Sequence, residues 1–428
     1  MTTINIQRAS LMLAALCCVF QSAVQAGFLD DAKGNLELRN FYFDRDFHGD
    51  TATQSRRDEW AQGLMLQLKS GFTPGPVGFG LDAVGMLGIK LDSAPDRSGT
   101  GLLPRGADNR AVDEYSKAVV TFKAKLSETE VRVGGLNPVL PLLASNYSRL
   151  LPQWFNGAQV VSKDLDKFTF TALEVNSTKL RDSTDSEDLT ATAQQGAYSA
   201  TVTSDRLYYV GVDYEPLKNL TLSVHTSELE DLFQRNFAGF KYRIQMGPGE
   251  AFTEWRYFTA KETGRDLLGK VDNRTLSTNF GYSIKGHTFS GGYQKASGDT
   301  AYASVGGTDT YLFSEQQLST FALAHERAWM MRYDYNFAAL GIPGLTFNVR
   351  YVKGDQVDPE HVSTVKARAL RASGGEGNEW ERTTDISYVI QSGTFKNVSV
   401  RWRNSTMRSN FTAPADENRV IVGYTFAF

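Results

Sequence analysis

Arginines recur at every second position near the end of the chain. Arg401 and Arg403 flank Trp402, and Arg419 stands in the final run of alternating apolar residues. Successive side chains of a β-strand point to opposite faces, so the two arginines share one face and the tryptophan lies on the other. Because a planar guanidinium group can bind both oxygens of a carboxylate, this face is suited to small carboxylates.

Basic residues outnumber acidic ones on this expected inner face. The further basic residues are Arg350, Arg332, Arg132, Lys123 and Lys125. The acidic residues are Glu59, Asp82, Asp334 and Asp385. In a narrow pore, such an excess concentrates anions and speeds their entry. The alternative is that the arginines pair with Asp334 and Asp385 and only brace the wall.

Motifs for catalysis are absent from the sequence. The five histidines (48, 225, 287, 325 and 361) are scattered, with no pair at metal-ligand spacing. No nucleophile elbow, phosphate loop or cysteine–histidine arrangement is visible. We therefore predict no enzyme, no catalytic residue, no metal site and no cofactor.

The first residues predict export. Arg8 precedes an apolar stretch at residues 11–20, which is too short to span a bilayer. We therefore predict a removed signal peptide at residues 1–26 and one domain at residues 27–428. Both cysteines fall in the signal peptide, so the mature chain is expected to have neither a disulfide nor a thiolate metal site.

The mature chain has the pattern of a transmembrane antiparallel β-barrel. No later stretch approaches the ~20 apolar residues of a membrane helix, whereas aromatic residues reach 12% and the chain ends in Phe428. Period-two runs separated by turns and loops fit 16 to 18 strands of about 9–11 residues. An exported soluble all-β protein is the alternative. The clearest runs cover residues 34–47, 59–69, 77–91, 119–126, 276–295, 329–353 and 381–428.

Three segments between the runs are expected to be loops. Residues 92–113 and 354–380 are long and polar. Residues 137–157 hold three prolines but are too apolar for a free surface loop, so we predict that they fold into the barrel and narrow it. Tyr147, Ser148 and Arg149 would lie near the tip of this constriction loop. Arg149 could instead anchor the loop through a salt bridge.

Several stretches resemble the OprD family of substrate-specific outer-membrane porins. They include FLDDAKGNLELRNFYFDRDF, VGFGLDAVGMLGIKLD, SRLLPQ, RYDYNFAALGIPGLTFNVRYVKGD and VSVRWRNSTMRS, in order along the mature chain. The resemblance implies an 18-stranded barrel, a constriction built by in-folded loops, and inner-wall basic residues that guide carboxylates. By position, the residues matched to that basic row are Arg401, Arg403, Arg419, Arg350, Arg132 and, in the constriction loop, Arg149.

The leading hypothesis is a passive, substrate-selective channel for small carboxylates, organic or aromatic acids. A channel for basic amino acids is the first alternative, although the segment QQLSTFALAHE has no acidic residue before Glu326. A barrel hydrolase and a non-conducting structural barrel are alternatives of other classes. Expected partners are carboxylate solutes, outer-membrane lipid and lipopolysaccharide, and the barrel-insertion machinery. A net charge of −3 gives no sign of nucleic-acid binding, and a monomer or loose trimer is expected.

Overall fold

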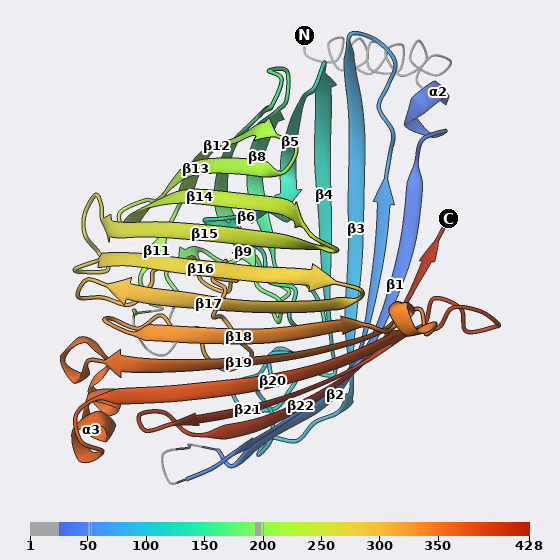
Figure 1. Cartoon of the computed structure of the whole chain (residues 1–428). Helices are drawn as coiled ribbons and strands as arrows, with labels where there is room; N and C mark the ends of the chain where they lie inside the picture. Colours follow the sequence, from blue (N-terminus) through green and yellow to red (C-terminus); the bar gives the residue numbers. More distant parts are fainter. Residues whose placement is uncertain (1–24, 50–51, 53, 193–197, 200) are drawn as a thin grey trace, which may run out of the picture.

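The described part of the chain is a closed β-barrel. The computed structural model describes residues 25–49, 52, 54–192, 198–199 and 201–428. Eighteen strands of these residues form one antiparallel sheet (Figure 1). All of the predicted signal peptide except residues 25 and 26 lies outside the described residues, which begin with the short helix α2 (Gln25–Phe28). Within the described ranges, no helix is both long enough and apolar enough to cross a membrane.

The strands follow the predicted period-two runs. The first nine strands of the barrel are β1 (Lys33–Phe47), β2 (Arg56–Lys69), β3 (Val77–Asp92), β4 (Glu114–Leu126), β5 (Thr129–Leu136), β8 (Trp154–Ser162), β9 (Phe168–Lys179), β12 (Leu207–Leu217) and β13 (Leu220–Leu229). The other nine are β14 (Phe233–Met246), β15 (Gly249–Glu262), β16 (Asp272–Ile284), β17 (His287–Ser297), β18 (Arg327–Asn336), β19 (Leu345–Val357), β20 (Gly377–Val389), β21 (Ser399–Ser409) and β22 (Ala415–Ala427).

The barrel closes between its first and last strands. β1 pairs with β2 on one side and with β22 on the other, as Figure 1 shows where the red strand lies beside the blue one. At the end of this seam the amide of Gly34 donates to the carbonyl of Phe428 at 2.8 Å, and the amide of Phe428 donates back at 2.9 Å. Closure leaves no strand edge with unpaired backbone groups, as a lipid environment requires.

The two faces of the wall differ as the alternation predicts. Large apolar side chains, among them Trp60, Leu66, Phe122, Met331 and Trp402, are exposed on the outside. The opposite faces of the same strands point into the barrel. Short turns join the strands at one end, such as the two-residue turn Lys285–Gly286, where both residues have positive φ as a type I′ hairpin requires. Long loops join them at the other end, which is the extracellular side in outer-membrane barrels.

The predicted constriction loop folds into the barrel. It is shorter than predicted, because Trp154 to Gly157 belong to β8, and it contains a small hairpin of β6 (Val139–Leu140) and β7 (Leu143–Ala144). Its side chains Leu142, Leu143, Leu150 and Leu151 are almost fully buried. Burying a leucine contributes about 1.5–3 kcal/mol, so these residues hold the loop against the wall.

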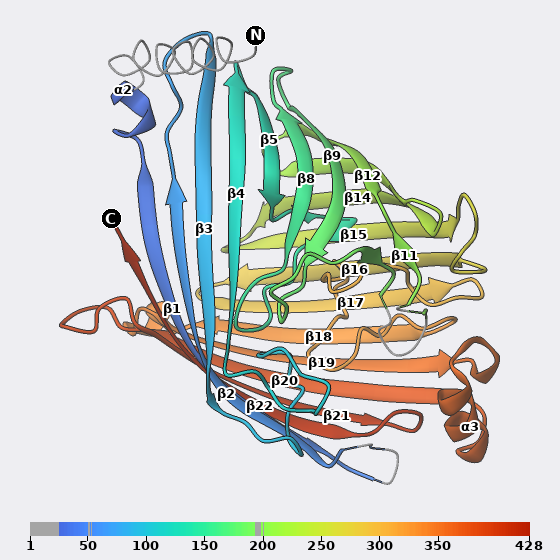
Figure 2. The ribbon, with the colours of Figure 1, turned by 180° about the vertical axis from the view of Figure 1, so that it is seen from behind.

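Loop 93–113 also folds inward, which its polar composition did not predict (Figure 2). Leu102 and Leu103 are buried, and the hydroxyl of Tyr115 donates to the carbonyl of Leu102 at 2.9 Å. Gly88 makes room for this tyrosine, because a Cβ at Gly88 would lie 2.2 Å from Cε1 of Tyr115.

Two further loops are more ordered than polar surface loops usually are. Loop 298–326, between β17 and β18, buries Tyr302, Val305 and Phe321 inside the barrel. The long polar loop predicted at residues 354–380 is shorter, because β19 extends to Val357 and β20 begins at Gly377. The remaining loop, 358–376, holds η3 (Pro359–His361) and the helix α3 (Thr364–Ala372), whose Leu370 packs against Phe411. The remaining short elements are β10 (Leu189–Thr190), β11 (Thr203–Ser204) and η2 (Phe337–Leu340).

Candidate functional site: an arginine-lined lumen

Two connected cavities lie inside the barrel on the side of the in-folded loops that faces the short turns. Their volumes are about 540 and 290 Å³, and both are lined by Ser387, Arg401 and Arg403. The larger cavity also reaches Arg332 and Arg350, and the smaller one reaches the constriction loop. The structure therefore brings together five of the eight predicted basic residues: Arg332, Arg350, Arg401, Arg403 and Arg419.

Asp385 is shared by Arg401 and Arg403. Nε of Arg401 lies 2.9 and 2.8 Å from the two carboxylate oxygens of Asp385, and Nε of Arg403 lies 2.7 Å from Oδ2. The side chain of Arg401 is 43% exposed, whereas that of Asp385 is only 11% exposed. One carboxylate thus faces two guanidinium groups, so one positive charge is left without a partner at this point of the wall.

Arg332 and Arg350 lie on neighbouring strands opposite each other in register. Arg332 forms an ion pair with Asp334 at 2.6 Å. Nε of Arg350 donates to Oε1 of Gln316 at 2.9 Å, so this arginine contacts loop 298–326 instead of a carboxylate. The alternative that arginines pair with Asp334 and Asp385 is therefore seen in the geometry, but it does not neutralise all of them.

Arg419 is buried beneath the constriction loop. Its Nε donates to Glu417, and the other carboxylate oxygen of Glu417 binds Arg45, both at 2.5 Å. A terminal nitrogen of Arg419 lies 3.5 Å from the carbonyl oxygen of Ser148. Because only 1% of the Arg419 side chain is exposed, the residue supports the loop more than it meets a solute.

Arg149 anchors the constriction loop through hydrogen bonds. Its Nε donates to the carbonyl of Thr100 at 2.9 Å, and a terminal nitrogen donates to the carbonyl of Ser148 at 3.1 Å. The guanidinium carbon also lies 5.1 Å from the ring centre of Phe43, within cation–π range. Tyr147 and Ser148 line the smaller cavity beside it.

The other three predicted basic residues line neither of these two cavities. Lys123 is buried and binds Asp82 at 2.6 Å and the carbonyl of Ser70 at 2.7 Å. Lys125 lies 3.5 Å from Glu128 beside a short turn. Arg132 pairs with Glu130 at 2.5 Å.

Two carboxylates of the inner wall hold the in-folded loops. Glu381 accepts hydrogen bonds from the backbone amides of Gln317, Leu318 and Ser319 at 3.0, 3.1 and 3.1 Å. Glu59 accepts from the amide of Thr100 at 2.9 Å. Both acids are directed at loop backbone, and neither of them lines the two cavities.

Loop 298–326 contains two partly buried acids, Asp309 and Glu315, that sequence reasoning missed. Nδ2 of Asn146 donates to Asp309 at 2.7 Å, which joins this loop to the constriction loop. Burial, followed by the nearby Glu315, raises the pKa of Asp309 to about 7. Glu315 accepts hydrogen bonds from the amide and hydroxyl of Thr310 at 3.0 and 2.7 Å. The sequence argument considered only the segment QQLSTFALAHE, residues 316–326, and both acids come before it in the chain.

Positive charge predominates around the two cavities. Their charged lining residues are Arg39, Arg149, Arg332, Arg350, Arg401, Arg403, Arg419, Glu37, Asp334 and Asp385. Seven guanidinium groups thus face three carboxylates. In a space walled by protein and loops, such an excess attracts anions more strongly than it would in open water.

The sequence and fold match known outer-membrane porins. A sequence profile described as outer membrane porin, OprD family, matches residues 26–428. The porin-like protein GalP of Pseudomonas putida is 36% identical over 406 residues, which cover 94% of this chain and 93% of that protein.

The chain belongs to the OprD family.

Solved structures of Pseudomonas aeruginosa proteins share the barrel of this OprD-family porin. OccK9 (OpdG) superposes with a TM-score of 0.88 at 39% identity, covering 94% of this chain and all of the other. OpdK, solved with vanillate, has a TM-score of 0.86 at 35% identity with the same coverages. The protein is therefore an integral outer-membrane β-barrel of a porin family, and its named relatives are channels rather than enzymes.

Proposed function

We propose that this OprD-family porin is selective for small solutes that carry a carboxylate, organic or aromatic acids, and that the inner-wall arginines guide them. The observation that carries the proposal is the shared Asp385. Two guanidinium groups, Arg401 and Arg403, face one carboxylate where the two cavities meet. A passing carboxylate can bind the exposed part of Arg401 without displacing Asp385.

Successive weak sites would let the solute move on. Arg332, Arg350 and Arg401 line the same 540 Å³ cavity, and Arg350 donates a hydrogen bond to the neutral Gln316. Several sites of moderate strength allow a solute to enter and still leave. Permeation down a gradient requires no cofactor.

A similar channel supports the choice of substrate class. OpdK has been solved with vanillate, which is an aromatic carboxylate. The barrel of this chain resembles that of OpdK over 94% of its length. Transfer of the substrate class to this protein is part of the proposal.

The test is single-channel recording of the full-length porin in a planar bilayer under a salt gradient. We expect an anion-leaning conductance that benzoate interrupts and arginine does not. The Arg401→Gln variant should need about three- to tenfold more benzoate for half-maximal block, because a charge-assisted hydrogen bond at a half-exposed site contributes about 1 kcal/mol.

Arg243→Gln provides the matched control. Arg243 is 49% exposed and pairs with Glu250 at 2.7 Å, but it lines neither cavity. Benzoate should block this variant at the same concentration as the wild type. A cation-selective channel that benzoate does not affect would contradict the proposal, and block by arginine instead would favour the channel for basic amino acids.

A further inference from the structure

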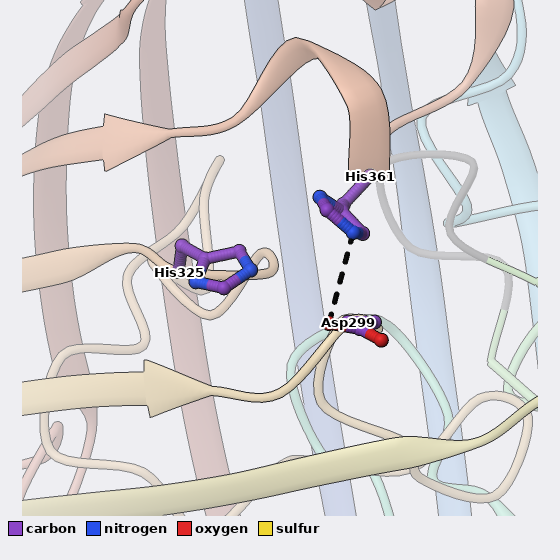
Figure 3. Close-up of side chains that lie close together, drawn as sticks. All are labelled: Asp299, His325 and His361. Carbon is purple, nitrogen blue, oxygen red and sulfur yellow. Dashed lines mark ion pairs between the residues drawn. The ribbon is translucent and has the colours of Figure 1, made fainter.

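Three side chains with metal-binding groups converge at the long-loop end of the barrel. Asp299 and His325 belong to loop 298–326, and His361 ends η3 in loop 358–376 (Figure 3). One ligand atom from each side chain lies within 4.8 Å of the others. Sequence spacing gave no sign of this cluster, because the two histidines are far apart in the chain and meet only when the loops fold.

The distances fit ligands of one ion better than a hydrogen-bonded pair. Nε2 of His361 lies 3.7 Å from Oδ1 of Asp299, which is too long for a hydrogen bond. Two donors on a tetrahedral zinc ion, each about 2.0–2.1 Å from the metal, lie roughly 3.3 Å apart. The imidazole rings of His325 and His361 have centroids 5.0 Å apart and stand at 60°. To share one ion, the three donor atoms would have to move from within 4.8 Å of one another to roughly 3.3 Å.

Neighbouring groups orient two of the three ligands. Nδ1 of His361 lies 3.3 Å from Oδ2 of Asp358, an ion-pair distance at which it makes no hydrogen bond, and Nε2 faces Asp299. Lys270 binds Oδ2 of Asp299, which leaves Oδ1 toward the histidines.

The backbone holds the third ligand in place. His325 has a φ of 64°, an uncommon conformation for a residue with a side chain. The tight turn around it is closed by hydrogen bonds between Leu323 and Glu326, at 3.2 Å through the backbone and at 2.9 Å from the Leu323 amide to Oε2 of Glu326.

We propose that Asp299, His325 and His361 form a binding site for a divalent transition metal ion, zinc in particular. Two imidazoles and one carboxylate are ligands that suit zinc and copper, whereas calcium and magnesium prefer oxygen ligands alone. With three protein ligands, the fourth position is left for water.

The ion would join loop 298–326 to loop 358–376. Loop 298–326 also binds Glu381 through three backbone amides and contacts Arg350 through Gln316. Asp299 and His325 lie at the two ends of loop 298–326, so a metal bound to both restrains a segment that borders the lumen. The proposed carboxylate selectivity does not depend on it.

Zinc titration of the refolded full-length porin in detergent tests the site. Isothermal calorimetry should find one zinc ion per chain, and the thermal unfolding midpoint should rise with added zinc, because an ion that binds only the folded state stabilises it. Cobalt should bind in the same place and give the visible absorption of a tetrahedral complex. His361→Ala should abolish this absorption, and Asp358→Asn should weaken binding by about 10- to 100-fold.

His48→Ala is the matched control. His48 lies 2.8 Å from Asp416, so it is also a histidine next to a carboxylate, but it is not part of the three-residue cluster. This variant should bind zinc like the wild type. Bilayer conductance would verify that each variant forms a barrel. Equal zinc binding by the wild type, His361→Ala and His325→Ala, or no zinc binding by a conducting wild type, would overturn the proposal.

Discussion

Asp385 determines how much positive charge its two arginine neighbours present to the lumen. Alternation along the strand correctly indicated that Arg401 and Arg403 point inward. It could not indicate that both would bind the same carboxylate, because that depends on β20 and β21 lying side by side with Asp385 opposite Arg403. Alternation along a strand thus predicts which face of the sheet a side chain lies on. The residue that it pairs with depends on the register of the neighbouring strand.

Asp309 makes the contact between two in-folded loops sensitive to pH. Its pKa is raised by burial to about 7, compared with 3.8 for a free aspartate, so the folded loop holds a proton that the unfolded loop would release. The contribution to stability is therefore complete below a pH of about 4 and is lost as the pH rises through about 7.

We expect current fluctuations from loop movement to increase as the pH rises through this range. Recordings of Asp309→Asn should lose that dependence, because an amide keeps the size of the side chain and does not titrate. Glu230→Gln in a short loop serves as a control that should behave like the wild type. The same pH dependence in Asp309→Asn would show that another group is responsible.

The in-folded loops are held by charged side chains of the wall as well as by apolar packing. Glu381 on β20 receives three backbone amides of loop 298–326, so a strand and a loop far apart in sequence share one charge. Charge-assisted hydrogen bonds contribute about 1.5–3 kcal/mol each where they are well formed. An element with no regular secondary structure thereby gains a defined position inside the barrel.

Removal of the charge at Glu381 should loosen loop 298–326 without unfolding the barrel. We expect Glu381→Gln to show a larger and noisier single-channel conductance, because the amide has one acceptor oxygen where the carboxylate has two, so at least one of the three backbone amides loses its acceptor. The unfolding midpoint of the barrel should stay close to that of the wild type. Glu250→Gln, on an exposed pair, is the control. An unchanged conductance in Glu381→Gln would mean that packing alone holds the loop.

Strands were predictable from sequence to a greater degree than loops. The period-two runs predicted a barrel, with Trp60 and Trp402 on its outer face and Arg401 and Arg403 on its inner face. Residues 92–113 show the limit, because their polar composition predicted a long loop but not the burial of Leu102 and Leu103 inside the barrel. A loop has no period, and its burial depends on what the closed ring places beside it, such as Tyr115.

Closure of the ring gives the molecule its stability as a whole. The last contact of the seam is the reciprocal pair of backbone hydrogen bonds between Gly34 and Phe428. The apolar exterior and the closed ring of the eighteen described barrel strands fit the outer-membrane location of the family.

Deletion of Phe428 should weaken this seam. Loss of two backbone hydrogen bonds removes roughly 1–3 kcal/mol, so we expect a lower midpoint for the heat-induced shift in electrophoretic mobility that marks barrel unfolding. Phe428→Leu keeps the backbone pair and should retain most of the wild-type midpoint. Equal midpoints for the deletion variant and the wild type would show that the terminal residue does not contribute to the seam.

Because the first and last strands are paired at the seam, the chain could begin and end at another turn without changing the order of the strands around the barrel. The first and last strands are neighbours, and Gly34 and Phe428 are in direct contact. A chain whose two ends were joined there by a short linker and reopened between Lys285 and Gly286 would contain the same ladders and the same lumen. The present position of the termini is therefore one of several that this ring geometry permits, and a circular permutation would change the order of synthesis without changing the pore.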